Sequence, residues 1–163
     1  MFRLQIVRFG TAALLTLVFV LPFFSQQRYE LRAQQNPKLD PATLKYQLPS
    51  RIHWVDDAIG AKSAVLLGDP SKPGLYIMLV KWTPHHMSHP HFHPNDRFIT
   101  VLSGTWWVGT GNKFDPDRTV PMPAGSFVTH YGKHVHFDGA KDQEAMLEIV
   151  GEGPATATPA EVK

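Results

Sequence analysis

Short segments rich in β-branched and aromatic residues, separated every eight to twelve residues by glycine or proline, dominate the sequence from residue 64 to residue 150. Such segments are typical of strands, and the residues between them are typical of turns. Strands of this spacing indicate an all-β domain, either a sandwich or a small barrel. We expect strands at residues 64–67, 75–83, 97–102, 105–108, 126–129 and 145–150.

The first 33 residues have the organisation of a secretory signal. Arg3 and Arg8 precede an apolar run at 9–24, which is short for a membrane span. We predict a signal peptide at 1–33, cleaved after Ala33, and therefore a domain that is periplasmic or secreted. The alternative is an uncleaved segment that anchors the domain to the inner membrane, on its outer side.

Two further segments flank the predicted barrel. Residues 34–50 have the pattern of an arm with one short helix, in which Asp40 caps the first turn and Pro41 takes its first position. We place the barrel at 51–151. The remaining residues, 152–163, are rich in Pro, Ala and Thr, which favours a flexible tail.

Composition excludes several classes of protein. The chain has no cysteine, so a thiol nucleophile, a cysteine-ligated zinc and a disulfide framework are all excluded. Its basic residues are concentrated at the front, because residues 34–163 hold 12 Lys and Arg against 13 Asp and Glu. A domain so close to neutral lacks the basic surface that nucleic acid requires, and we expect no nucleic-acid partner.

Histidine is the residue type that most constrains the chemistry. Eight of the nine histidines lie in one third of the chain. Alternate residues of a strand face the same side, so His89, His91 and His93 can share one face, and His134 and His136 can share another. Three converging imidazoles suit Fe, Zn, Mn, Ni or Cu. The pattern predicts one divalent metal ion and leaves its identity open.

Two stretches resemble the motifs of the cupin superfamily. The HFH sequence at 91–93, followed by a strand and Gly104, is similar to the first cupin motif, and residues 125–136 are similar to the second in spacing. The resemblance covers about residues 82–150 and is strongest to small, single-domain bacterial cupins. It implies a cupin-type double-stranded β-helix, which is a jelly-roll barrel.

The resemblance also implies a ligand set and an assembly. The metal ligands that it implies are His91, His93 and His136. His89 and Asp96 are additional candidates, the latter if a one-residue bulge turns it toward the metal. Many barrels of this type dimerise by packing one sheet on the partner's, so the resemblance implies a homodimer.

Arg97 occupies the position of the glutamate in the first motif. A guanidinium carries no acceptor and stays protonated, so it cannot bind a metal, and the implied site has three histidines. Two explanations of this arginine stay open. It holds an anionic substrate, or it pairs with Asp96 or Asp138 and supports the barrel wall.

Two functions follow as hypotheses. The first is an exported, metal-dependent enzyme that acts on a small, anionic molecule, such as a dioxygenase, a lyase or an isomerase. In that enzyme Arg97 orients the substrate, and His130 or His134 transfers protons. The alternative is a non-catalytic cupin module that binds a metal or a small ligand.

Overall fold

The structure, a computed structural model, describes residues 39–162, and the chain divides into two units between Tyr46 and Gln47. Every described strand belongs to the second unit. The strands are β1 (Val55–Asp56), β2 (Ala61–Leu67), β3 (Gly74–Trp82), β4 (His86–Met87), β5 (His91–Phe92), β6 (Arg97–Ser103), β7 (Thr105–Thr110), β8 (Val120–Pro123), β9 (Phe127–His130), β10 (His136–Ala140), β11 (Ala145–Gly153) and β12 (Thr158–Pro159). Two 3₁₀ helices accompany them, η1 (Pro49–Arg51) and η2 (Pro116–Arg118).

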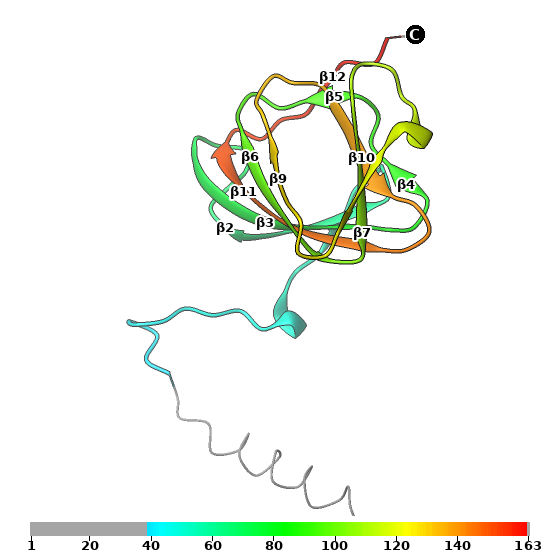
Figure 1. Ribbon diagram of the computed structural model, residues 1–163. Coiled ribbons are helices and arrows are strands. Elements are labelled where there is room, and N and C mark those ends of the chain that lie inside the picture. The colour runs from blue at the N-terminus through cyan, green and yellow to red at the C-terminus, as the bar shows by residue number, and fades with distance from the viewer. Residues whose placement is uncertain (1–38, 163) are drawn as a thin grey trace, which may run out of the picture. The chain divides into compact units, whose positions relative to one another are not determined.

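The strands form two antiparallel sheets that curve around a common interior (Figure 1). The first sheet has the order β1-β2-β3-β11-β6-β9, and the second has the order β12-β5-β10-β7-β8, with β4 also paired to β10. Strands that are neighbours in a sheet are mostly distant in the chain, because β11 inserts between β3 and β6. This arrangement confirms the predicted all-β double-stranded β-helix, and all six predicted strands are present.

The core lies between the sheets and follows from the alternation of side chains along the strands. On β3, Tyr76 and Trp82 are 0% and 4% exposed, and on β11 Leu147 and Ile149 are equally buried. Trp106 packs against them from β7 and is also 0% exposed. Each such side chain contributes about 1.5–3 kcal/mol through burial.

The chain passes from the first sheet to the second between β6 and β7, at Gly104. This residue has a φ of +72°, and a Cβ there would lie 2.0 Å from the backbone oxygen of Glu144. Only glycine fits both the left-handed backbone and the close approach. The sheet change therefore depends on one residue of the first cupin-like motif.

In place of the short helix that we predicted after Asp40, the described part of the first unit contains a single turn capped by this residue. Its Oδ1 accepts a hydrogen bond from Ala42 N at 2.9 Å, and its backbone oxygen accepts one from Leu44 N at 3.0 Å. The turn does not extend into a longer helix, because residues 39–46 are all exposed and a short helix without packing is marginal in water. The helix η1 follows at the start of the second unit.

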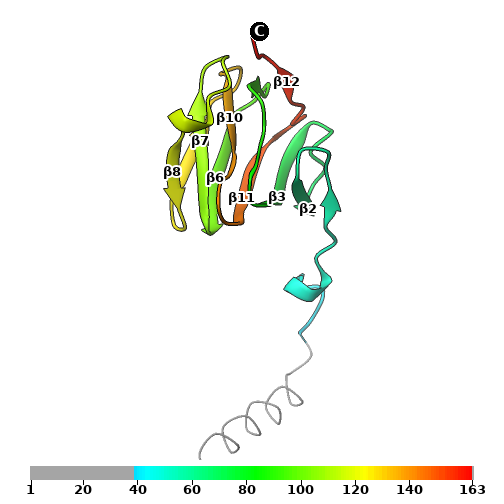
Figure 2. The ribbon, with the colours of Figure 1, turned by 90° about the vertical axis from the view of Figure 1, so that its right-hand side faces the viewer.

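The C-terminal segment differs from the flexible tail predicted at 152–163. Strand β11 runs on to Gly153, and the chain continues from it to β12 (Figure 2). Strand β12 pairs with β5, in the histidine-rich stretch. Further bonds join Ala155 N to Pro70 O at 2.7 Å and Ala160 N to Pro90 O at 2.8 Å. The prediction of a flexible tail was wrong because it used composition alone. Backbone hydrogen bonds hold this segment, and they do not depend on which side chains it carries.

The predicted signal segment at 1–33 lies outside the described residues. Within residues 39–162, no helix has the length and apolar character that crossing a membrane requires.

Candidate metal centre

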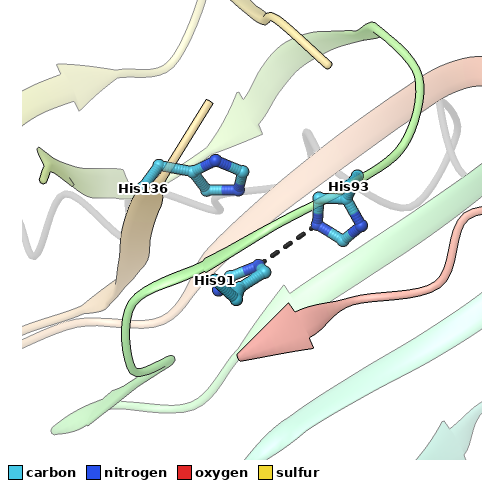
Figure 3. Close-up of side chains that lie close together, drawn as sticks. All are labelled: His91, His93 and His136. Atoms are coloured by element: carbon cyan, nitrogen blue, oxygen red, sulfur yellow. Dashed lines mark hydrogen bonds between the residues drawn. The ribbon is translucent and has the colours of Figure 1, made fainter. Parts of the chain in front are cut away.

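Three imidazole rings converge where β5 meets β10 (Figure 3). His91 lies on β5 and His136 begins β10, and the two residues are paired in register. His93 comes just after β5 and is 6% exposed. The Nε2 atoms of His91 and His93 lie 3.1 Å apart, and one ring nitrogen from each histidine lies within 4.8 Å of the others.

Backbone carbonyls fix the orientation and the tautomer of all three rings. Because a carbonyl can only accept, Nδ1 must carry the proton in each ring, and Nε2 is left with a free lone pair. The acceptors are His89 O at 2.8 Å for His91, Thr156 O at 3.1 Å for His93 and His134 O at 3.1 Å for His136. Hydrogen bonds from the second ring nitrogen to a backbone carbonyl are typical of metal-binding histidines.

The surroundings keep these rings neutral. Burial, followed by the charge of Arg97, lowers the pKa of His93 from 6.5 to about 3. Burial also lowers the pKa of His136 to about 4, although the nearby Asp138 opposes the shift. Neutral imidazole is the form that binds a metal, so the site is ready to bind near pH 7.

The donor set fits a divalent transition metal. Imidazole nitrogens bind such ions at about 2.0–2.1 Å, which puts two of them on one ion about 3 Å apart. The distance between His91 and His93 has this value, and His136 Nε2 is buried without a hydrogen-bond partner among residues 39–162. Three histidines leave coordination positions open for other molecules.

Three of the candidate residues lie elsewhere. His89 points away from the triad, stacks on Phe114 and contacts Glu161 Oε2 at 2.7 Å. Asp96 accepts a hydrogen bond from the backbone of the turn after β9, and its side chain is not part of the histidine group. His134 is exposed, and its ring bonds within its own turn while its backbone oxygen supports His136.

Arg97 and His130 face each other across β6 and β9 on the interior side of the first sheet. Arg97 Nη2 donates to His130 Nδ1 at 3.3 Å. Because the guanidinium is a donor only, the proton of the neutral ring must sit on Nε2. The ring of His130 lies 3.8 Å from that of His136, measured between centroids. His130 therefore presents an N–H donor beside the metal ligands.

The electrostatics keep His130 neutral as well. Burial, followed by the charge of His136, lowers its pKa from 6.5 to about 3. A neutral ring with its proton on Nε2 can donate a hydrogen bond to an oxygen atom, and it cannot take up a proton at that nitrogen. This limits the predicted proton-transfer role of His130 to that of a donor.

Neither aspartate proposed as a partner of Arg97 forms an ion pair with it. The described part of the chain has four ion pairs, and Arg97 belongs to none of them. Asp138 is buried and accepts instead from Trp106 Nε1 at 2.8 Å and from Ser88 Oγ at 3.2 Å. Nearby histidines and Arg97 hold the pKa of Asp138 below its ordinary value, against the opposing effect of burial.

Sequence reasoning missed three contributors to the site. Tyr76 faces the interior from β3, and the carbonyls of Ala155 and Thr156 hold the ring of His93. The alternation along residues 75–83 could have placed Tyr76 on the inner face. Nothing in the sequence marks the two carbonyls, because every residue has one.

Comparisons with known proteins identify the fold. No protein-family model matches the chain, and no curated protein matches its sequence. Among solved structures, the polyketide cyclase RemF from Streptomyces resistomycificus is 16% identical, with a TM-score of 0.61 over 74% of this chain and 87% of that one. An RmlC-like cupin from Shewanella frigidimarina is 14% identical, with a TM-score of 0.55 over 69% and 92%. A cupin-2 domain from Rhodospirillum rubrum is 13% identical, with a TM-score of 0.55 over 74% and 80%.

The double-stranded β-helix and these similarities show that the chain has the fold of the cupins, as the resemblance predicted. The interior of this fold holds a group of three histidines able to bind a metal, with Arg97 and His130 beside it.

Proposed function

We propose that this cupin is an exported, metal-dependent enzyme acting on a small molecule at the site formed by His91, His93 and His136. The observation that carries the proposal is the convergence of three Nε2 lone pairs, each oriented by a backbone carbonyl. Structural similarity to the polyketide cyclase RemF and to DMSP lyases is consistent with small-molecule chemistry. Dioxygenation, elimination by a lyase and isomerisation are the reaction classes that we propose.

A bound divalent ion would supply Lewis-acid chemistry, or redox chemistry if it is iron. The residues of this chain do the rest. Arg97 binds and orients an anionic group of the substrate. His130 donates its Nε2 proton in a hydrogen bond to an oxygen on which negative charge develops. The buried surroundings of both residues exclude competing water.

The alternative is a module that binds a metal or a small ligand without catalysis. The loss of the motif's glutamate favours it, because one ligand of the usual cupin site is missing. The orientation of Arg97 and His130 beside the triad favours the enzyme, since a site for storing metal needs neither.

Metal content tests the proposal. The full chain, expressed without an affinity tag, is analysed by mass spectrometry beside the His91→Ala and His136→Ala variants. We expect about one equivalent of metal in the parent protein and less than a tenth of that in each variant, with circular dichroism unchanged. His134→Ala is the matched control and should keep the metal, because only its backbone supports the site.

No metal in the parent protein, and none taken up from micromolar Fe, Zn, Mn, Ni or Cu, would contradict the metal-dependent function. Retention of metal by both ligand variants would place the ion elsewhere.

We also propose that the N-terminal segment directs the domain to the periplasm or beyond, with cleavage after Ala33. Arg3, Arg8 and the apolar run at 9–24 support this. Cell fractionation and N-terminal sequencing of the recovered protein test it. A new N-terminus at Gln34 is expected, whereas an intact chain in the membrane fraction indicates anchoring and an intact cytoplasmic chain refutes export.

A homodimer is the assembly that we propose. The outer face of the first sheet exposes Phe98 and Phe127, which are 44% and 65% accessible and stack with their centroids 6.5 Å apart. Exposed apolar surface of this kind is typical of an interface. A monomer by light scattering at micromolar concentration would refute this assembly.

A further inference from the structure

Arg97 is a charged side chain in an environment that disfavours charge. Burial lowers the pKa of its guanidinium, although Asp138 and Tyr76 act in the opposite direction. It forms no ion pair with any carboxylate of the described chain. The side chain is half-buried, and its one side-chain hydrogen bond in the described chain goes to the neutral ring of His130. A cation held partly away from water without a carboxylate in contact is unfavourable, so a residue placed in this way calls for an anion from outside the chain.

Arg97 and two of its neighbours each have a buried donor without an acceptor. Arg97 Nε, Tyr76 Oη and His130 Nε2 have no hydrogen-bond partner within residues 39–162. The first and the last carry a proton that only an acceptor can satisfy, and the phenol also offers one. A cluster of donors around a cation matches a carboxylate, whose two oxygens accept several bonds.

Gly151 lies between two of these donors in the register of the sheet. It is the register partner of Tyr76 on one side and of Arg97 on the other. A Cβ at this position would lie 2.8 Å from Tyr76 Oη, so any side chain would displace the phenol. The bare backbone therefore allows the phenol to lie over β11 on the side of Arg97.

A cavity of about 370 Å³ continues from Arg97 along the inner face of the first sheet. Met78, Val80 and Ile149 form its apolar wall, and Pro70, Ala155 and Thr156 lie at its edge. Arg97 is the one charged residue among those that line it. Such a lining suits an apolar body and offers a carbohydrate few hydrogen bonds.

Two of the residues that line the cavity are also bonded to the metal centre. The backbone oxygens of Ala155 and Thr156 accept hydrogen bonds from the ring of His93. Arg97 is hydrogen-bonded to His130, and the ring of His130 lies against that of the ligand His136. Arg97 therefore links the cavity to the histidine triad through one intervening ring.

We propose that Arg97, Tyr76 and His130 form a carboxylate subsite, and that the cavity beside it receives the apolar part of the same molecule. The substrate class is then an apolar monocarboxylate, with its acidic end at the metal centre. The inference rests on the proposed function in that it names the substrate class of the same site.

Binding of hexanoate to the full chain by titration calorimetry tests the inference without any assay of activity. Hexanamide keeps the shape and loses the charge, while acetate keeps the charge and loses the apolar body. We expect each to bind at least about tenfold more weakly than hexanoate. Hexanamide loses hydrogen bonds to a charged group, which contribute about 1.5–3 kcal/mol each, and acetate loses the burial of its methylene groups, which contributes about 0.8 kcal/mol each. Both comparisons use the unaltered protein, so they do not depend on the folding of a variant.

Variants then locate the carboxylate. Arg97→Met and Gly151→Ala should weaken hexanoate binding by about 10–100-fold, and Tyr76→Phe by about tenfold. Arg118→Met, which changes an exposed arginine on η2, should bind like the parent protein. Arg97→Met should also melt at the same temperature or higher, whereas a merely structural arginine would lower the melting temperature when lost.

His91→Ala separates this inference from the metal-dependent function. If it loses the metal and still binds hexanoate, both proposals stand. If hexanoate binding is lost in His91→Ala and kept in Arg97→Met, the carboxylate lies on the metal, and the subsite is refuted while the metal site stands. Equal binding of hexanoate and hexanamide, or no binding of hexanoate, also overturns the subsite, whatever the metal content.

Discussion

The inner face of the first sheet has two halves with the same alternation of side chains along the strands. One half forms a closed apolar core, and the other carries polar side chains beside a cavity. Toward one end, β6 and β11 contribute Val101 and Leu147, which are each 1% exposed in a closed apolar core. Toward the other end the same strands contribute Arg97 and Gly151, beside a cavity and the histidine triad. The closed half is stabilised by apolar contacts among its own side chains. The open half leaves donors and lone pairs without partners, which is a cost to the fold that a ligand can offset.

The largest difference between the two halves is expected in acid, which should destabilise the protein through the histidines of the open half. His93, His130 and His136 have pKa values of about 3, 3 and 4 in the folded chain, against about 6.5 when unfolded. The unfolded state therefore binds more protons between these limits. Stability is fully present above about pH 6.5 and falls as the pH decreases toward 4 and 3.

The expected loss for the metal-free protein is about 1.4 kcal/mol per pH unit for each histidine, or on the order of 5 kcal/mol between pH 7 and pH 5 for the three. Urea unfolding after dialysis against a chelator measures it. His130→Gln should reduce the slope by about a third. A flat profile over this range would mean that the open half is not what makes the chain sensitive to acid.

Leu147→Ala tests the closed half. Removing a buried leucine side chain without collapse of its surroundings costs about 2–5 kcal/mol. Metal stoichiometry should stay at one equivalent under conditions where the variant is folded, because Leu147 touches neither the triad nor Arg97 in the register of the sheet. Urea unfolding and metal analysis of the same preparation check both parts. Loss of metal from the folded variant would show that the two halves are coupled.

Sequence reasoning worked better for the closed half than for the open half. The long strands β3, β6 and β11 repeat their apolar residues over seven to nine positions, so their alternation is visible in the sequence. Strands β4, β5 and β12 have two residues each, which is too short for any periodicity. Their pairing depends on partners that the chain brings together only when it folds.

The candidate ligands show the same limit. The three histidines expected from the cupin resemblance do lie together, but alternation alone allowed His89 and His134 as readily. His89 turns outward before Pro90, where its ring meets Phe114 and Glu161. The lack of an ion pair at Arg97 could not be predicted either, because it depends on Asp138 being held by Trp106.

Trp106 joins the two halves, and its loss should have an intermediate effect. Its ring is in the closed core, 0% exposed, while Nε1 donates to Asp138 beside the histidines. Trp106→Phe should cost about 1–3 kcal/mol, since a buried carboxylate loses a donor. Trp107→Phe is the matched control and should cost less than about 1 kcal/mol, because this neighbour is only half-buried and contacts Lys141.

Equal costs for the two tryptophan variants by urea unfolding would refute the role of the Trp106–Asp138 bond. If metal affinity falls in Trp106→Phe and not in Trp107→Phe, the core residue Trp106 helps to orient the residues of the metal centre.

The smallest effect is expected at Glu161, on the segment that lies beside the open half. Its contact with His89 is an exposed side-chain hydrogen bond, whereas β12 and the bonds from Ala155 and Ala160 hold the segment through the backbone. Glu161→Gln should therefore change stability by less than about 1 kcal/mol and leave metal affinity unchanged. Chain termination after Gly153 removes Thr156, whose carbonyl orients His93, and should weaken metal binding by about 10–100-fold. Isothermal titration of metal into both variants checks the pair. A large loss in Glu161→Gln would mean that side chains, and not backbone pairing, keep the segment against the metal centre.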